Sequence, residues 1–179
     1  MANEFTYQVI KDTTEKAVIK LTGKFDSTDQ EDNAHRIQAN TLYGALDANN
    51  VPLRSALSVS NTAKSYYGTT VHRIWYDTLN ATNADVELFW NADTSNTLML
   101  MSGNGEYDGA GNWVTIPNPI VGADGCNGDI GIRTRGMGAN NSYTIVIELR
   151  KQNEYYQRGQ FNDPAAFNYG TDYGIRPGN

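Results

Sequence analysis

This sequence contains few cysteines and histidines, the residues that most often form disulfides and metal sites. Its 179 residues include one cysteine, Cys126, so no disulfide can form within the chain. The two histidines, His35 and His72, are far apart in the sequence, with no cysteine or carboxylate at ligand spacing around either. A metal site built on a histidine is therefore not expected, and His72 is expected to lie on the face of a strand.

Basic charge and long apolar runs are scarce as well. Lys and Arg number 14 against 20 Asp and Glu, which gives a net charge of −6 and leaves no basic patch. Nucleic-acid binding depends on Lys and Arg contacts to phosphates and is not expected. No apolar run approaches the roughly 20 residues of a membrane span. The opening MANEFTYQVIKDTTEK lacks the basic and apolar regions of a signal peptide. We expect no membrane among the partners.

Short alternating segments separated by turn residues are abundant. Segments 5–10 and 17–22 flank a polar turn, which predicts a hairpin, and an acidic loop follows up to residue 33. Segment 41–46 fits a short helix or a strand, and it is too short for periodicity to decide. Further strands are predicted at 34–39, 53–60, 70–77, 86–90, 98–101, 113–116, 130–134 and 143–149.

The spacing of these segments predicts an all-β fold. No amphipathic stretch is long enough for a crossover helix, so an antiparallel β-sandwich or jelly-roll-like domain is expected. One body is predicted over residues 1–150, with its best-defined strands at 70–150.

The two most regular segments predict the core. In each of them every second residue is apolar, so the apolar set faces one side of the sheet. On the strand over 86–90, Glu87 and Phe89 are expected on the opposite face, and Glu148 is expected to face outward from the last strand. The predicted inward residues are Val86, Leu88, Trp90, Ile145, Ile147 and Leu149.

Residues 151–179 differ from the body. They contain six Tyr and Phe residues, four Gly and two Pro, with neither a helical nor a strand period. Such a segment cannot build its own core, and it is too aromatic for a solvated disordered tail. We therefore expect an extended arm that lies on another surface through aromatic anchors. The predicted anchors are Tyr155, Tyr156, Phe161, Phe167, Tyr169 and Tyr173.

Few residues remain as candidates for chemistry. Asp124 and Asp129 flank a Gly-rich segment that superficially resembles a calcium loop but lacks the closing Glu, so a tight turn is expected and a bound cation is the alternative. Cys126 in the same segment has no His base near it and is expected to be a small buried thiol. The sequence has neither a nucleophile elbow nor a phosphate loop. We expect no catalytic residues and no cofactor.

Three tryptophans raise carbohydrate binding as an alternative function, because β-sandwich modules stack sugars on exposed rings. Trp90 shares a face with Val86, which favours a core position. Trp75 flanks the centre of a strand, and Trp113 precedes the bend expected at Pro117.

The part of the chain from Arg73 to Lys151 resembles small β-rich structural proteins of tailed-bacteriophage particles. The resemblance is a pattern of strands and turns without an active-site signature, and it covers neither the start of the chain nor the aromatic arm. The matching segments are Arg73–Asp77, Val86–Thr94, Gly103–Gly105, Gly128–Ile130 and Ser142–Lys151.

The resemblance implies a non-enzymatic virion protein, assembled in the host cytoplasm. Its first interpretation is a capsid decoration, or cement, protein that binds and stabilises the phage head. A neck or tail component of the same particle and a carbohydrate-binding β-sandwich module are the alternatives. The expected partners are the major capsid protein or other virion proteins, together with further copies of this chain.

Overall fold

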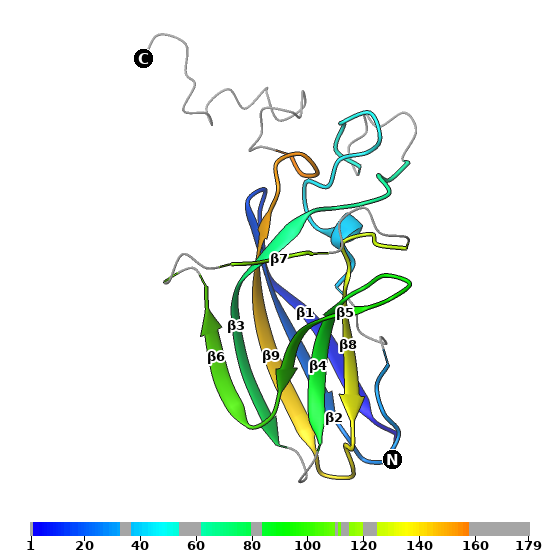
Figure 1. Ribbon diagram of the computed structural model, residues 1–179, viewed down its shortest axis with the longest axis vertical. Coiled ribbons are helices and arrows are strands. Elements are labelled where there is room, and N and C mark those ends of the chain that lie inside the picture. Colours follow the sequence, from blue (N-terminus) through cyan, green and yellow to red (C-terminus); the bar gives the residue numbers. More distant parts are fainter. Residues whose placement is uncertain are drawn as a thin grey trace.

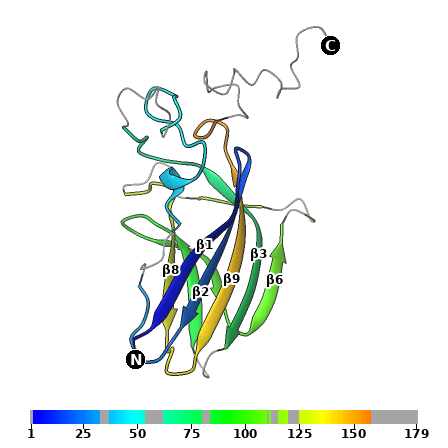
Figure 2. The ribbon, with the colours of Figure 1, turned by 180° about the vertical axis from the view of Figure 1, so that it is seen from behind.

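The computed structural model describes residues 2–32, 37–53, 62–79, 84–109, 111, 115–119 and 125–157. Over these residues the regular elements are β-strands and one short 3-10 helix (Figure 1). The strands form two antiparallel sheets, which confirms the predicted all-β class and fits a β-sandwich (Figure 2). No described segment is a helix of the length and apolarity needed to cross a membrane.

The larger sheet begins with the predicted hairpin. β1 and β2 pair antiparallel, and a bulge between Val9 and Lys11 leaves Ile10 outside the pairing. β9 then lies between β2 and β3, so the last strand completes the sheet that the first two begin. The order across the sheet is β1 (Glu4–Asp12), β2 (Lys16–Lys24), β9 (Ser142–Lys151), β3 (Thr69–Leu79) and β6 (Asn104–Asp108), with β7 (Ile116–Pro117) also paired to β3.

The smaller sheet has β4 (Asp85–Trp90) between β5 (Asn96–Met101) and β8 (Ile130–Arg135). The chain that follows β2 runs beside β8, where Asp32 and Ile37 form isolated bridges with Arg133 and Ile130. β5 therefore remains as the outer strand on the other side of this sheet.

The core lies between the two sheets, as the alternation predicts. All six predicted inward residues of β4 and β9 are buried, with exposures of 0–1%. β2 and β3 contribute Ile19, Leu21, Val71 and Ile74, and β8 contributes Ile132.

The other face of β4 is also buried, which the alternation alone did not indicate. Glu87 is 3% and Phe89 is 2% exposed. The Arg133 guanidinium lies 4.6 Å from the Phe89 ring centroid and its Nη1 is 3.5 Å from Glu87. Arg135 also pairs with Glu87, and the Thr97 hydroxyl donates to it at 2.6 Å. These neighbours cover the outer face of the central strand and satisfy its buried carboxylate.

The loops around residues 37–53 and the segment that follows β9 lie at the end of the sandwich opposite the N-terminus, called the loop end below (Figures 1 and 2). Segment 41–46 is neither a regular helix nor a strand, because the 3-10 helix Ala39–Thr41 (η1) leads into isolated bridges at Ala45 and Leu46. Gly128 packs against this end with φ of 89°, and a Cβ there would lie 1.9 Å from the Tyr67 carbonyl oxygen. Most of the strands predicted at 34–39 and 53–60 lies outside the described residues.

Candidate interaction surface

Two of the predicted arm anchors belong to the body. Tyr156 is fully buried, its hydroxyl donates to the Ala39 carbonyl at 2.8 Å, and its ring lies 5.8 Å from that of Tyr67. Tyr155 is half-buried and meets Tyr66 edge-on at 5.1 Å. This corrects the predicted role of Tyr156, whose ring fills a place in the core of its own chain and presents no surface to a partner.

Lys151 explains why the chain stays on the body beyond β9. Its side chain is completely buried, and its ammonium group donates to Asp12 and to the carbonyls of Thr13 and Tyr43, the last two at 2.6 and 2.7 Å. It also lies 5.1 Å from the Tyr156 ring centroid. Burial lowers the pKa of Lys151, and the hydrogen bond and charge of Asp12 oppose that shift. This ammonium group connects the β1–β2 turn, the loop after η1 and the end of β9.

Backbone hydrogen bonds continue the attachment to Gln157. The Gln152 N–H donates to Gly68 at 3.1 Å, the Leu46 N–H to Tyr155 at 2.9 Å, and the Gln157 N–H to Gly44 at 2.7 Å. The predicted boundary at residue 150 is therefore too early, because the body includes residues 151–157. The other predicted anchors, Phe161, Phe167, Tyr169 and Tyr173, lie outside the described residues.

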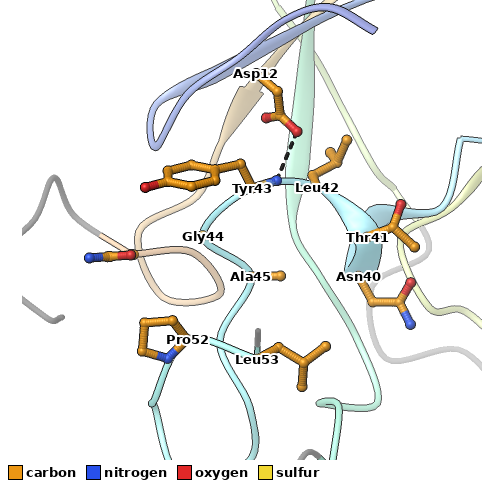
Figure 3. A pocket seen from close by; sticks show the side chains of 10 residues that line it. Asp12, Asn40, Thr41, Leu42, Tyr43, Gly44, Ala45, Pro52 and Leu53 are labelled. Carbon is orange, nitrogen blue, oxygen red and sulfur yellow. Dashed lines mark hydrogen bonds between the residues drawn. The ribbon is translucent and has the colours of Figure 1, made fainter. Parts of the chain in front are cut away.

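A hollow of about 200 Å³ lies beside the point where the described chain ends (Figure 3). The Asp12 carboxylate points at the backbone of Tyr43 and accepts its N–H at 2.8 Å, and Tyr43 itself is 54% exposed. The hollow mixes apolar side chains with a carboxylate, a threonine hydroxyl and two amides. Its lining residues are Asp12, Asn40, Thr41, Leu42, Tyr43, Gly44, Ala45, Pro52, Leu53 and Gln157.

A second surface runs along β1, the edge strand next to this hollow. Tyr7 pairs with Leu21 and Val9 with Ile19, so both point to the same side as the core residues of β2. Tyr7 is nevertheless 41% exposed and Val9 44%, while Ile10 at the bulge is 54% exposed. Burial raises the pKa of Tyr7, and the charge of Asp12 adds to the shift. The sequence predicted the hairpin but gave no sign that this part of its apolar face is uncovered.

Among the candidates for metal binding, Asp129 has a structural role. Asp129 is buried and accepts hydrogen bonds from the Ala39 N–H at 2.7 Å and the Asn127 amide at 3.0 Å, while Asp124 lies outside the described residues. His72 is half-buried, and burial together with nearby Arg150 lowers its pKa. Within the described ranges, no three His, Cys, Asp or Glu side chains are grouped as a metal site would require. His35 also lies outside these ranges.

The remaining candidates were Cys126 and the tryptophans. Cys126 is buried, as predicted, and accepts a hydrogen bond from the Asn118 amide at 3.4 Å. Trp90 is 1% exposed and belongs to the core, as predicted. Trp75 is half-buried on the outer face of the larger sheet, 6.0 Å from the Arg73 guanidinium, and Trp113 lies outside the described residues.

Sequence reasoning missed a buried acid near the other end of β9. Glu31 is 1% exposed, and its carboxylate accepts a hydrogen bond from the Tyr143 hydroxyl at 2.5 Å. Burial raises the pKa of Tyr143, and the negative charge of Glu31 raises it further. Glu31 lies in the acidic stretch that the sequence assigned to a loop, and no periodicity there marks it as buried.

Comparison with known proteins adds no family assignment to the fold. A scan against protein-family models found no match to this chain, and searches of curated proteins and of solved structures found none either. The molecule is an antiparallel two-sheet β protein with an apolar edge strand and a C-terminal segment attached to the body up to Gln157.

Proposed function

We propose that this protein is a non-enzymatic structural component of a tailed-phage particle, a capsid decoration protein that binds the assembled head. The observation that carries the proposal is the fixed base of its C-terminal segment. Lys151, Tyr156 and Gln157 hold that base on the folded body, and residues 158–179, which include four aromatic residues, begin from it. A defined starting point reduces the conformational entropy that the segment loses when it docks.

The proposed mechanism is binding that favours the assembled state. A protein that binds the complete shell and not its dissociated subunits stabilises the shell by about 2.7 kcal/mol when its concentration is one hundred times Kd. The net charge of −6 supports a position on the outside of the head, since an acidic surface is repelled by packaged DNA.

The first test is the copy number of this chain in purified particles, measured by quantitative mass spectrometry. Particle symmetry sets that number, so hundreds of copies support a decoration protein, while about a dozen or fewer indicate a neck or tail component. Absence from the particles would refute the virion function altogether.

The second test asks whether the C-terminal segment is the anchor. A chain ending at Gln157 keeps the buried Tyr156 and is expected to unfold at the same denaturant concentration as the full chain, but to be lost from particles. Among single Ala substitutions at Phe161, Phe167, Tyr169 and Tyr173, at least two should weaken retention by about 2 kcal/mol, or about 30-fold. Full retention of the chain ending at Gln157 would show that the anchor lies elsewhere on the body.

A further inference from the structure

β1 is an edge strand without the usual protection against pairing. Within the described residues it pairs with β2 alone. Exposed edges are normally blocked by charged residues, prolines or bulges, because they present unpaired backbone groups to other chains. The stretch from Phe5 to Ile10 contains neither charge nor proline, and its bulge comes only at the end, at Ile10. This edge is therefore open to another strand.

The two faces of β1 differ in chemistry. Phe5, Tyr7 and Val9 point to the apolar inner side, where Tyr7 and Val9 are exposed by 41% and 44%. Thr6 and Gln8 pair with Thr22 and Lys20 and point to the outer side.

The two ends of β1 carry opposite charges on that outer side. Glu4 opposes Lys24, two residues from the outward Thr22. The bulge at Ile10 changes the alternation, so that Lys11 opposes Val18 and also points outward. An acidic and a basic residue thus lie at the two ends of the same face of one strand.

We propose that β1 pairs antiparallel with β1 of a second copy of this chain, about a two-fold axis at Tyr7. In this register Tyr7 faces Tyr7 of the other copy, Phe5 faces Val9, and Thr6 faces Gln8. Inner residues then meet inner residues, as direct antiparallel pairing requires. The partly exposed Tyr7 and Val9 of both copies come together in one apolar cluster.

Charge complementarity favours a second copy as the occupant. About the axis at Tyr7, Glu4 of each copy lies within one residue of Lys11 of the other, on the same outer face, at both ends of the pairing. Moving the axis to Gln8 would set Glu4 directly opposite Asp12. A two-fold pairing also uses each open edge once and so closes the assembly.

Residues 158–179 are less suited to this edge. They contain Pro164, Pro177 and four glycines, and their sequence does not alternate. The proposed pairing does not rest on the virion function, because it uses β1 and not the C-terminal segment. It sets the loop ends of the two bodies at opposite ends of the dimer, since β1 runs from the N-terminal end toward the loop end (Figure 2).

Sedimentation equilibrium of the full chain at about 50 μM tests the pairing. A contact between two single edge strands is small, so its Kd is expected in the micromolar range. We expect a mass of twice 19.8 kDa for the unaltered chain and 19.8 kDa for Val9→Lys. Leu100→Lys is the matched control, because Leu100 is 56% exposed on β5, the edge strand of the other sheet. It should remain dimeric. A monomeric unaltered chain, or a dimer lost in Leu100→Lys and kept in Val9→Lys, would overturn the proposal.

Cysteine cross-linking tests the register. Cα atoms of directly opposed antiparallel residues lie about 4.5–5.5 Å apart, within the range that a disulfide bridges. In a Cys126→Ala background, Tyr7→Cys should therefore form a covalent dimer on mild oxidation. Val9→Cys alone should not, because the two Val9 positions lie about 14 Å apart in this register. It should instead cross-link with a second chain that carries Phe5→Cys.

Two outcomes would contradict this register and occupant. Self-cross-linking by Val9→Cys but not by Tyr7→Cys would place the axis elsewhere on β1 and refute pairing about Tyr7. A chain ending at Gln157 that is monomeric while the full chain is dimeric would assign the contact to residues 158–179. Circular dichroism of the Tyr7 and Val9 variants should match the unaltered chain, because these two side chains are partly exposed and contribute little to the core.

Discussion

Replacing Lys151 should destabilise the protein more than replacing any exposed lysine. In Lys151→Met the side chain keeps most of its volume and its contact with Tyr156, but the ammonium group is lost. Asp12, whose side chain is 17% exposed, then loses the ammonium group that pairs with it, and the carbonyls of Thr13 and Tyr43 lose a donor. Removing one partner of a buried ion pair costs about 3–5 kcal/mol, mainly because the other charge stays buried and uncompensated.

A second substitution separates the cost of the unpaired Asp12 charge from the cost of lost side-chain packing. Asp12→Asn/Lys151→Met keeps an oxygen that can accept the Tyr43 N–H but leaves no buried charge. The double variant should therefore recover a clear part of the stability lost in Lys151→Met, a positive coupling of about 1–3 kcal/mol. Against a typical total of about 5–15 kcal/mol, both changes are readily measured.

Urea unfolding followed by tryptophan fluorescence gives the free energies, and Lys16→Ala is the control. Lys16 lies 3.3 Å from Glu148 with 41% of its side chain exposed, and the charge of Arg73 remains near Glu148, so the loss of Lys16 should cost clearly less than the loss of Lys151. If Lys151→Met costs no more than Lys16→Ala, the Lys151 cluster does not hold the loop end to the body, and the fixed base of the C-terminal segment loses its physical explanation.

Two further predictions concern the core and the buried phenols. Trp90→Ala should cost about 3–5 kcal/mol in urea unfolding, whereas Glu148→Ala, on the outer face beside Lys16, should cost clearly less; equal costs would contradict the assignment of faces. Burial raises the pKa of Tyr156 well above its ordinary value near 10. Above pH 10 the unfolded chain therefore loses a proton that the folded chain keeps, so stability should fall with rising pH, by about 1.4 kcal/mol per pH unit for this group. Tyr156→Phe should remove that contribution, and an unchanged slope between pH 10 and 11 would show that Tyr156 ionises in the folded state.

The strands were predictable because their side chains obey one local rule. The sequences of β4 and β9 place apolar residues at every second position, so only one face of each strand can be the inner face. The burial of Glu87 and Phe89 was not predictable, since it depends on Arg133 and Arg135 of β8, a strand more than forty residues away in the sequence. Alternation gives the direction of a side chain, but only the paired strand determines whether that direction is covered.

The candidate surface was less predictable, because long-range contacts determine it. Tyr155 and Tyr156 follow the last regular strand, and local pattern assigned them to an arm together with the later aromatic residues. Their position in the body depends on Tyr66, Tyr67 and Ala39, which come from two distant loops. A lysine is rarely buried, so nothing in the sequence marked Lys151 as the residue that connects these loops to β9.

In the two proposals, association depends on two separate parts of the molecule, the fixed base of the C-terminal segment and the open edge at β1. At the loop end, Lys151 and Tyr156 hold the chain on the body as far as Gln157, so the proposed contacts of residues 158–179 would contribute to affinity and not to folding. At β1, apolar residues that would stabilise the sandwich if covered remain partly exposed at a cost to the isolated body, which a second strand would remove. A chain ending at Lys151 lacks Tyr156 and should lose stability, whereas a chain ending at Gln157 should lose only binding. The difference between the two truncations therefore separates folding from assembly in one experiment.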